Sequence, residues 1–336
     1  MVYAYTPLII TSIPFIWMRR CWEVGLLLLH GGAGRWRRNY KGALGVIRDA
    51  CRHGYRFIES GRVLDAVVEA VAYMEDSGLF NAGVGSVLNL AGYREMDAGV
   101  MDSLGNVGGV TLARYPRNPV RLAHIVARES DHVILAGAEA DKLAKNRGLE
   151  PLPPPPTRIT RMYKSLIKKY KSGRLERFKS NLKIARDLGL LDTVGAVGVC
   201  DDGVLATATS TGGVWLKLPG RIGDSPIPGS GFYADERIAF SATGIGEAIL
   251  RVQPGSRLSM LTEKGLRLGE AISTLSHYIN RTVGAETMGF IALSPQEAYA
   301  FINTRHMMIA WCSDEETHAV LLEKPEGVNH VIYRIR

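Results

Sequence analysis

Clustered cysteine and closely spaced histidine are what this sequence most conspicuously lacks. The four cysteines lie far apart and form no C-x-x-C pair; they are Cys21, Cys51, Cys200 and Cys312. The eight histidines contain no H-x-x-x-H spacing. We therefore predict no disulfide framework, no zinc site and no catalytic transition metal. We also predict a location in the reducing cytoplasm.

Long hydrophobic runs are also missing. The stretch from Pro7 to Met18 is largely apolar, but it is too short to cross a bilayer and is interrupted by Pro14. Positive charge follows it at Arg19-Arg20 rather than preceding it, and no small-residue cleavage site is evident. We therefore predict no membrane association and interpret residues 1–24 as an N-terminal extension of unknown role, with a start at Met18 as the alternative.

The positive charge of the chain is confined to one segment. The net charge is +8, yet the stretch from Arg158 to Lys183 holds ten Lys or Arg against one acid, which gives +9 and leaves the rest near −1. The Pro-rich run Pro151–Pro156 precedes it, and aromatic residues lie within it. A basic run with aromatics can bind nucleic acid, but such runs are more often solvated linkers. We therefore predict a linker over 148–192 and no nucleic-acid partner.

The remaining composition is that of a globular protein with a sizeable core, with 46% apolar and 22% charged residues over 336 positions. Its first strong pattern is a buried strand, Leu26–Leu29, that runs into the glycine-rich sequence His30-Gly31-Gly32-Ala33-Gly34. A phosphate-binding loop would need Gly-Lys-Ser/Thr or dinucleotide spacing of the glycines, and neither is present.

A β-hairpin is the clearest local prediction. Two apolar runs, Val194–Cys200 and Val204–Ala208, flank Asp201-Asp202-Gly203, and an Asp-Gly turn between such runs is a strong hairpin signal. Thr193 begins the first run, and the cluster Thr209–Gly213 ends the second. The hairpin therefore brings hydroxyl groups from both strands to one end of a sheet.

Other segments predict a mixture of helices and strands. Leu64, Val67, Val68 and Val71 follow the i, i+3, i+4, i+7 pattern of an amphipathic helix. Strands are predicted over 95–102, 107–113 and 133–137, and helices over 119–128 and 138–145. Asp97 and Asp102 resemble paired catalytic carboxylates, but we interpret them as residues that make structural hydrogen bonds.

Several motifs together resemble one known family. Thr193-Val-Gly-Ala-Val, then Ala-Thr-Ser-Thr-Gly-Gly, then Leu-Pro-Gly-Arg-Ile-Gly-Asp-Ser-Pro are similar to the plant-type L-asparaginases and isoaspartyl aminopeptidases, which are N-terminal-nucleophile hydrolases. The resemblance runs from about Leu27 to Trp311, with the motifs in the order of that family. It implies an α+β fold, a four-layer αββα sandwich forming a single domain over 25–336, and a dimer of cleaved αβ units.

The resemblance also implies a self-activated enzyme. A threonine hydroxyl is a poor nucleophile unless a base takes its proton, and a free α-amine, with a pKa near 7.7–8.0, can do so. That amine exists only after cleavage between Asp192 and Thr193, so we expect Thr193 to attack the Asp192 carbonyl in an N→O acyl shift. Hydrolysis of the ester would leave an α chain of 1–192 and a β chain of 193–336.

The other site residues follow from the resemblance by position. Thr211 would tune the Thr193 hydroxyl, and Thr243 with Gly244 would form an oxyanion hole. Arg221 and Asp224 would hold the α-carboxylate and α-ammonium of an amino-acid substrate, unless they form a mutual surface ion pair. Asn81 would position the substrate, and Gly246 would offer a main-chain contact.

No organic cofactor is implied, but a structural sodium ion is. In the resembled family a loop wraps Na⁺ with main-chain oxygens, and carbonyl oxygens suit such a hard cation. The corresponding residues of this sequence are Met74, Glu75, Ser77, Phe80, Ala82 and Val84.

The sequence departs from the commoner family pattern at several positions. Asp192 stands where many members have Gly, Ile245 replaces a frequent Thr, and Ile309 lies where a charged residue is usual. These changes leave the substrate open among L-asparagine, β-aspartyl dipeptides and the glycosylated asparagine of glycosylasparaginases. A protein-cleaving threonine aspartase is disfavoured because a pocket that grips free α-groups should refuse internal peptide bonds. The remaining alternative is an uncleaved, non-catalytic protein that binds acidic partners through residues 158–183.

Overall fold

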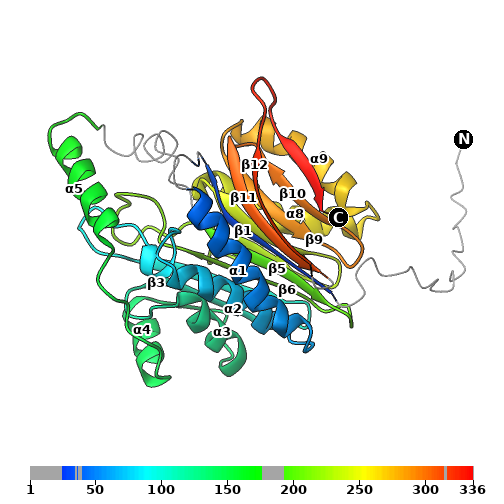
Figure 1. Ribbon diagram of the computed structural model, residues 1–336, viewed down its shortest axis with the longest axis horizontal. Coiled ribbons are helices and arrows are strands. Elements are labelled where there is room, and N and C mark those ends of the chain that lie inside the picture. Colours follow the sequence, from blue (N-terminus) through cyan, green and yellow to red (C-terminus); the bar gives the residue numbers. More distant parts are fainter. Residues whose placement is uncertain (1–24, 35, 37–39, 176–192, 314–315, 336) are drawn as a thin grey trace, which may run out of the picture.

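Two β-sheets with helices packed against them form the protein (Figure 1). The computed structural model describes residues 25–34, 36, 40–175, 193–313 and 316–335. Strands and helices are mixed along the chain, which confirms the predicted α+β class. Among the described residues no helix has the length and apolar character needed to cross a membrane.

The larger sheet has eight strands in the order β12-β11-β1-β5-β6-β2-β3-β4. All neighbours are antiparallel except β3 and β4. The predicted hairpin lies at its centre, because β5 pairs with β1 on one side and β6 on the other. Its strands are β1 (Gly25–Gly34), β2 (Met96–Asp102), β3 (Val107–Ala113), β4 (Ile134–Ala136), β5 (Val194–Cys200), β6 (Leu205–Thr211), β11 (His306–Ser313) and β12 (Glu316–Glu323).

The second hairpin strand ends within the predicted hydroxyl cluster. The apolar run reaches Ala208, and β6 continues through the first three residues of the cluster to Thr211. Its last residues have partners on both sides, since Ser210 pairs with Val194 of β5 and Thr211 pairs with Asp97 of β2. The hydroxyl cluster therefore belongs to the rigid sheet rather than to a loop.

The smaller sheet has five antiparallel strands in the order β13-β10-β9-β8-β7. Its strands are β7 (Phe232–Ala234), β8 (Ala239–Gly244), β9 (Met288–Leu293), β10 (Ala298–Ile302) and β13 (Val331–Ile335).

Alternation along β1 shows how the elements pack. Leu27 and Leu29 belong to a core cluster with the helices over the larger sheet, whereas Leu26 and Leu28 belong to one shared with the smaller sheet. Successive side chains of a strand point to opposite faces, so four consecutive leucines fit a strand that is buried on both sides. A further cluster joins the smaller sheet to helices α7 to α9.

The helices over the larger sheet include the predicted amphipathic one. The residues of its apolar stripe, Leu64, Val67, Val68 and Val71, are all buried. Figure 1 shows α1 and α2 against β5 and β6, and α8 and α9 beside β9 and β10. The helices are α1 (Tyr40–Ile58), α2 (Val63–Asp76), α3 (Pro119–Glu129), α4 (Gly137–Asn146), α5 (Thr157–Lys171), α7 (Gly246–Val252), α8 (Pro254–Glu263) and α9 (Leu268–Val283).

Part of the predicted linker is a helix. Residues 157–171 form α5, whose Ile159 and Leu166 are buried against Leu88 and Trp215. The basic side chains occupy the remaining faces of this helix, so the charge run that suggested a solvated linker also contains an apolar stripe. Residues 176–192 of the predicted linker lie outside the described residues.

Candidate active site

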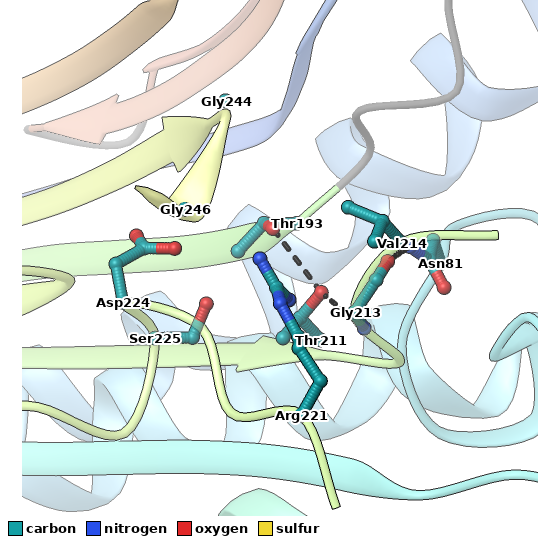
Figure 2. A pocket seen from close by; sticks show the side chains of 10 residues that line it. All are labelled: Asn81, Thr193, Thr211, Gly213, Val214, Arg221, Asp224, Ser225, Gly244 and Gly246. Atoms are coloured by element: carbon teal, nitrogen blue, oxygen red, sulfur yellow. Dashed lines mark hydrogen bonds between the residues drawn. The ribbon is translucent and has the colours of Figure 1, made fainter. Parts of the chain in front are cut away.

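One cavity opens at the end of the β5–β6 hairpin where both threonines lie (Figure 2). It collects Thr193, which directly precedes β5, and residues from β6, the loop after α2, the loop after β6, the end of β8 and the start of α7. All the residues predicted to bind substrate line it, together with three that the sequence did not suggest. The lining residues are Asn81, Thr193, Thr211, Gly213, Val214, Arg221, Asp224, Ser225, Gly244 and Gly246.

Thr193 and Thr211 are in direct contact at the base of the cavity. The Thr193 hydroxyl donates to Oγ1 of Thr211 over 3.2 Å, and Oγ1 of Thr211 also accepts from the Gly213 N–H over 3.0 Å. Both side chains are buried. The two hydroxyls are therefore in hydrogen-bond contact. The predicted role of Thr211, which is to tune the Thr193 hydroxyl, stays a prediction.

Asn81 ties the loop after α2 to this end of the hairpin. Its side-chain Nδ2 donates to the Gly213 carbonyl over 2.6 Å, and its main-chain carbonyl accepts from the Gly212 N–H over 2.8 Å. A Cβ on Gly212 would lie 2.5 Å from Oδ1 of Asn81. Only glycine fits that close approach, which explains the first of the two glycines, Gly212.

Arg221 does not pair with Asp224, so the suggested mutual ion pair is wrong. Nε and Nη2 of Arg221 each donate to a carboxylate oxygen of Glu247 over 3.0 Å, which is a bidentate pair. Glu247 lies in the first turn of α7. The arginine side chain is only 15% exposed, and its guanidinium points into the cavity in Figure 2. Glu247 therefore fixes the orientation of Arg221 and leaves its Nη1 for a ligand.

Asp224 is a buried carboxylate without a protein partner at Oδ2 among the described residues. Burial raises its pKa from 3.8 to about 7, and the Arg221 guanidinium opposes this rise. Gly246 makes room for both groups, since a Cβ there would lie 2.7 Å from Nη2 of Arg221 and 2.9 Å from Oδ1 of Asp224. A cationic ligand group would therefore find an unpaired acceptor beside a guanidinium.

The predicted oxyanion pair is only partly in the cavity. Gly244 lines it, whereas Thr243 is not among the lining residues. The Thr243 hydroxyl is fully buried and accepts from the Ala33 N–H over 3.1 Å. That contact joins the end of the glycine-rich part of β1 to β8. A direct role for the Thr243 hydroxyl stays a prediction.

Asp97 and Asp102 have the structural character that we inferred. Asp102 accepts from the N–H groups of Leu104 and Asn106 and from the Asn106 amide, all in the β2–β3 turn. Oδ1 of Asp97 accepts from the Leu112 N–H over 2.9 Å, and its Oδ2 lies 3.9 Å from Nζ of Lys217. Neither carboxylate lines the cavity.

The predicted sodium loop surrounds a tight turn. A Cβ on Gly85 would lie 2.0 Å from the Phe80 carbonyl oxygen, so that carbonyl points into the loop. Three of the predicted ligand carbonyls already accept hydrogen bonds: Met74 from the Ser77 hydroxyl, Ala82 from the Gly85 N–H and Val84 from Arg94. A carbonyl oxygen has a second lone pair for an ion, but the guanidinium brings a positive charge that opposes one. Sodium at this loop stays a prediction.

The side chain of Glu75, in the last turn of α2, serves a different purpose. Its Oε1 accepts from the Ser210 hydroxyl of β6 over 2.5 Å and from the Val120 N–H over 3.3 Å. Burial raises its pKa to about 8. The end of α2 is therefore fastened directly to the strand that carries Thr211.

Several buried polar residues around the site escaped the sequence reasoning. His30 contacts the Ser241 hydroxyl over 2.9 Å, which in turn contacts the Thr209 hydroxyl over 2.6 Å. Burial lowers the pKa of His30 to about 3, so this network is held by a neutral imidazole. Glu247 and Lys217 were also missed. Lys217 had a signal, because a lysine that follows Val214-Trp215-Leu216 interrupts an apolar run.

One predicted residue of the cleavage site lies outside the described residues. Asp192 directly precedes the part of the chain that begins again at Thr193. Its proposed role as the cleaved residue therefore stays a prediction.

Comparison with known proteins gives matches along most of the chain. Residues 23–322 match the model of a protein family described as asparaginase. A plant-type L-asparaginase of Pyrobaculum calidifontis is 42% identical over 309 residues, which cover 88% of this chain and 99% of that protein. An isoaspartyl peptidase of Escherichia coli is 36% identical over 323 residues, which cover 90% and 98% respectively. An isoaspartyl peptidase/L-asparaginase of Danio rerio is 40% identical over 268 residues, which cover 77% and 82%.

Proposed function

The chain belongs to the asparaginase family, and on that premise we propose that this hydrolase cleaves L-asparagine, β-aspartyl dipeptides or both through an acyl-enzyme on Thr193. Relatives named L-asparaginase and isoaspartyl peptidase match nearly the whole chain and support this substrate class. The single observation that carries the proposal is the contact between the Thr193 and Thr211 hydroxyls in a cavity that also contains Arg221 and Asp224.

Activation comes first. The hydroxyl oxygen of Thr193 attacks the carbonyl carbon of Asp192, the peptide C–N bond breaks, and the α-nitrogen of Thr193 takes up a proton. Water then hydrolyses the resulting ester, which frees the carboxylate of Asp192 and restores the hydroxyl. The new α-amine is a base poised near working pH. The position of Thr193 directly before the rigid strand β5 supports this step, because the sheet fixes the attacking group.

Turnover uses the same hydroxyl. The α-amine of Thr193 takes the hydroxyl proton, and Oγ1 attacks the side-chain carbonyl of the β-aspartyl group. The amide C–N bond breaks, the leaving nitrogen takes the proton, and ammonia or an amino acid departs. Water cleaves the acyl-enzyme to release aspartate. The negative charge that develops on the carbonyl oxygen would be met by the Gly244 N–H.

The polar groups of the cavity fit the α-substituents of an amino acid. The guanidinium of Arg221 suits the α-carboxylate, since Glu247 already holds two of its nitrogens in place. The carboxylate of Asp224 suits the α-ammonium, whose charge would replace the missing partner at Oδ2. These two contacts require both α-groups to be free, which favours free asparagine and isoaspartyl N-termini over internal peptide bonds.

A layer order, an assembly, a location and an ion are proposed with this function. The three apolar clusters, one over the larger sheet, one shared by both sheets and one between the smaller sheet and α7 to α9, support a four-layer αββα order. A dimer of cleaved αβ units, a cytoplasmic location and an ordered sodium ion stay predictions.

Replacing the nucleophile tests the proposal. The Thr193→Ala variant should remain one polypeptide on a denaturing gel and lose at least about 10⁴-fold in turnover of L-asparagine and of a β-aspartyl dipeptide. The Thr193→Ser variant is the matched control and should keep partial cleavage and activity. Glycosylated asparagine belongs in the same assay to separate the glycosylasparaginase alternative. Undiminished hydrolysis by the alanine variant would falsify the assignment of Thr193.

A further inference from the structure

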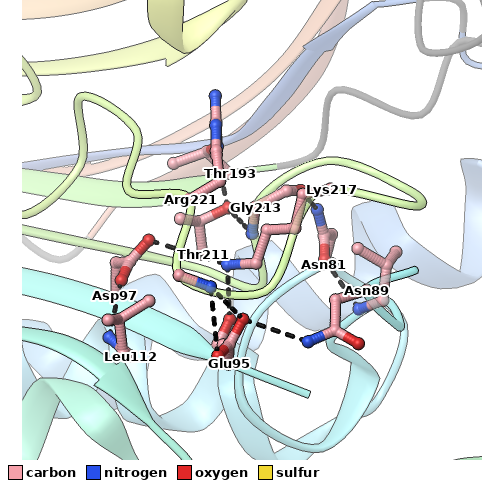
Figure 3. Close-up of polar contacts among 12 residues, drawn as sticks. Asn81, Asn89, Glu95, Asp97, Leu112, Thr193, Thr211, Gly213, Lys217 and Arg221 are labelled. Atoms are coloured by element: carbon pink, nitrogen blue, oxygen red, sulfur yellow. Dashed lines mark hydrogen bonds and ion pairs between the residues drawn. The ribbon is translucent and has the colours of Figure 1, made fainter. Parts of the chain in front are cut away.

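A buried charged cluster lies directly beneath the threonine pair (Figure 3). Lys217 has a side-chain exposure of 1%, and Asp97, its ion-pair partner at 3.9 Å, has 0%. Nζ of Lys217 also donates to the main-chain carbonyl of Glu95 over 2.7 Å. An ion pair of this kind is costly to bury and seldom adds to stability, so its place in the molecule calls for another explanation.

The ammonium of Lys217 contacts the turn that holds Thr211. A Cβ on Gly213 would lie 2.8 Å from Nζ and 2.8 Å from Cδ of Lys217, so the lysine packs directly on the main chain of Gly213. The N–H of Gly213 is the one that donates to Oγ1 of Thr211. On the other side of Thr211, Asp97 is its paired residue across the β2–β6 ladder. Lys217 and Asp97 therefore both lie next to Thr211, whose hydroxyl contacts that of Thr193.

Glu95 connects the same cluster to the arginine loop. Both oxygens of its carboxylate accept from the Gly220 N–H, over 3.3 and 3.2 Å, and one of them accepts from Asn89 over 3.0 Å. Gly220 immediately precedes Arg221. The main-chain carbonyl of Glu95 thus holds the lysine beneath the threonines, while its side chain holds the loop that presents the guanidinium.

We propose that Lys217 and Glu95 are positioning residues for the reaction, with Lys217 fixing the Thr193–Thr211 pair and Glu95 fixing Arg221. This inference rests on the proposed function and assigns different kinetic roles to the two residues. Loss of Lys217 disturbs the reacting hydroxyl and lowers kcat. Loss of the Glu95 carboxylate disturbs binding of the α-carboxylate and raises KM.

The experiment compares the two positions in the full-length protein. Lys217→Met, which keeps the length of the side chain, should lower kcat by about 10–100-fold and leave KM within about threefold, because small misplacements of reacting groups are costly. Glu95→Gln should raise KM by about 10-fold and change kcat little. A general loss of packing would not lower kcat alone in one variant and raise KM alone in the other.

Two further variants keep the test decisive. Lys324→Met removes another buried lysine, which donates to the main-chain carbonyl of Val328 and pairs with the carboxylate of Glu286. Lys324 contacts none of the residues that line the cavity. It should keep the wild-type kcat and KM. If Lys217→Met fails to fold, Asp97→Asn takes its place and should lower kcat with KM unchanged.

The outcomes separate this inference from the proposed function. The role of Lys217 is overturned if kcat of Lys217→Met, or of Asp97→Asn in its place, falls no further than that of Lys324→Met. The role of Glu95 is overturned if Glu95→Gln leaves KM unchanged. Both results count even if Thr193→Ala is inactive. Activity that survives in Thr193→Ala overturns the assignment of Thr193 as the nucleophile, whatever the other variants show.

Discussion

The two ends of the β5–β6 hairpin satisfy their polar groups in opposite ways. At the closing turn, Gly203 N–H donates to Cys200, Cys200 N–H donates to Val204, and Asp202 accepts from Val204, all within five residues. This turn is exposed at Asp201 and Asp202. At the open end, Thr211 and Gly213 depend on Asn81, Asp97 and Lys217, which come from distant parts of the chain or lie buried beneath the turn.

The contrast shows which end of the hairpin carries the larger free-energy cost of buried polar groups. A polar group that stays at the surface or bonds to its own turn is inexpensive, whereas burying an ion pair and hydroxyls far from water is not. The open end retains such groups, including Oδ2 of Asp97 and Oδ2 of Asp224 without hydrogen-bond partners among the described residues. We interpret this end as the one that catalysis has shaped.

The largest effect in this comparison should come from Thr211. A Thr211→Val substitution keeps the shape but removes the oxygen that accepts from Thr193 and Gly213, so we expect kcat to fall by about 10²-fold and stability by about 1–3 kcal/mol. Steady-state kinetics on L-asparagine and thermal unfolding measure the two effects. A variant with normal kcat would show that the Thr211 oxygen is dispensable.

A smaller, pH-dependent effect should come from Asp224. Its pKa of about 7 means that the buried carboxyl is neutral in acid and becomes charged as the pH rises through 7. An α-ammonium binds only the charged form, so inhibition by L-aspartate should strengthen about tenfold per pH unit from pH 5 to 7 and then level off. Inhibition constants for the wild type and Asp224→Asn provide the test, because the asparagine variant should bind weakly at every pH. Equal slopes in both proteins would count against Asp224 as the group responsible.

The smallest effect should come from the closing turn. Asp202→Ala removes one local hydrogen bond at an exposed position, so stability should change by less than about 1 kcal/mol, with kcat and KM unchanged. Steady-state kinetics and thermal unfolding, as for Thr211→Val, measure these effects. Asp202→Ala is thus the control for Thr211→Val at the other end of the hairpin. A loss of activity here would remove the distinction between the two ends.

Local patterns predicted several of the elements. The Asp-Gly turn located the hairpin, and the spacing of Leu64, Val67, Val68 and Val71 located the buried face of α2. Both features depend on residues close together in the sequence, where turn chemistry and periodicity carry the information. The resemblance added the positions of Arg221, Asp224 and Gly246, which the structure brings into one cavity.

Contacts between distant segments were harder to foresee. Nothing near Arg221 in the sequence indicated that Glu247, 26 residues later, would hold it instead of Asp224. The pairing of Lys217 with Asp97 depends on how β2 lies beside β6, which one-dimensional patterns do not specify. The charge of α5 hid this helix, because its six basic residues outweigh a narrow apolar stripe in any average over the segment.

The central claim is that a newly freed amine activates the hydroxyl of Thr193, and the intact mass of the purified protein tests it most directly. The purified protein should consist of two chains that divide at Thr193, with the β chain beginning on an unblocked amine that an amine-reactive reagent modifies as activity is lost. A fully active protein that shows only one undivided chain of 336 residues, or a β chain with a blocked amine, would contradict it.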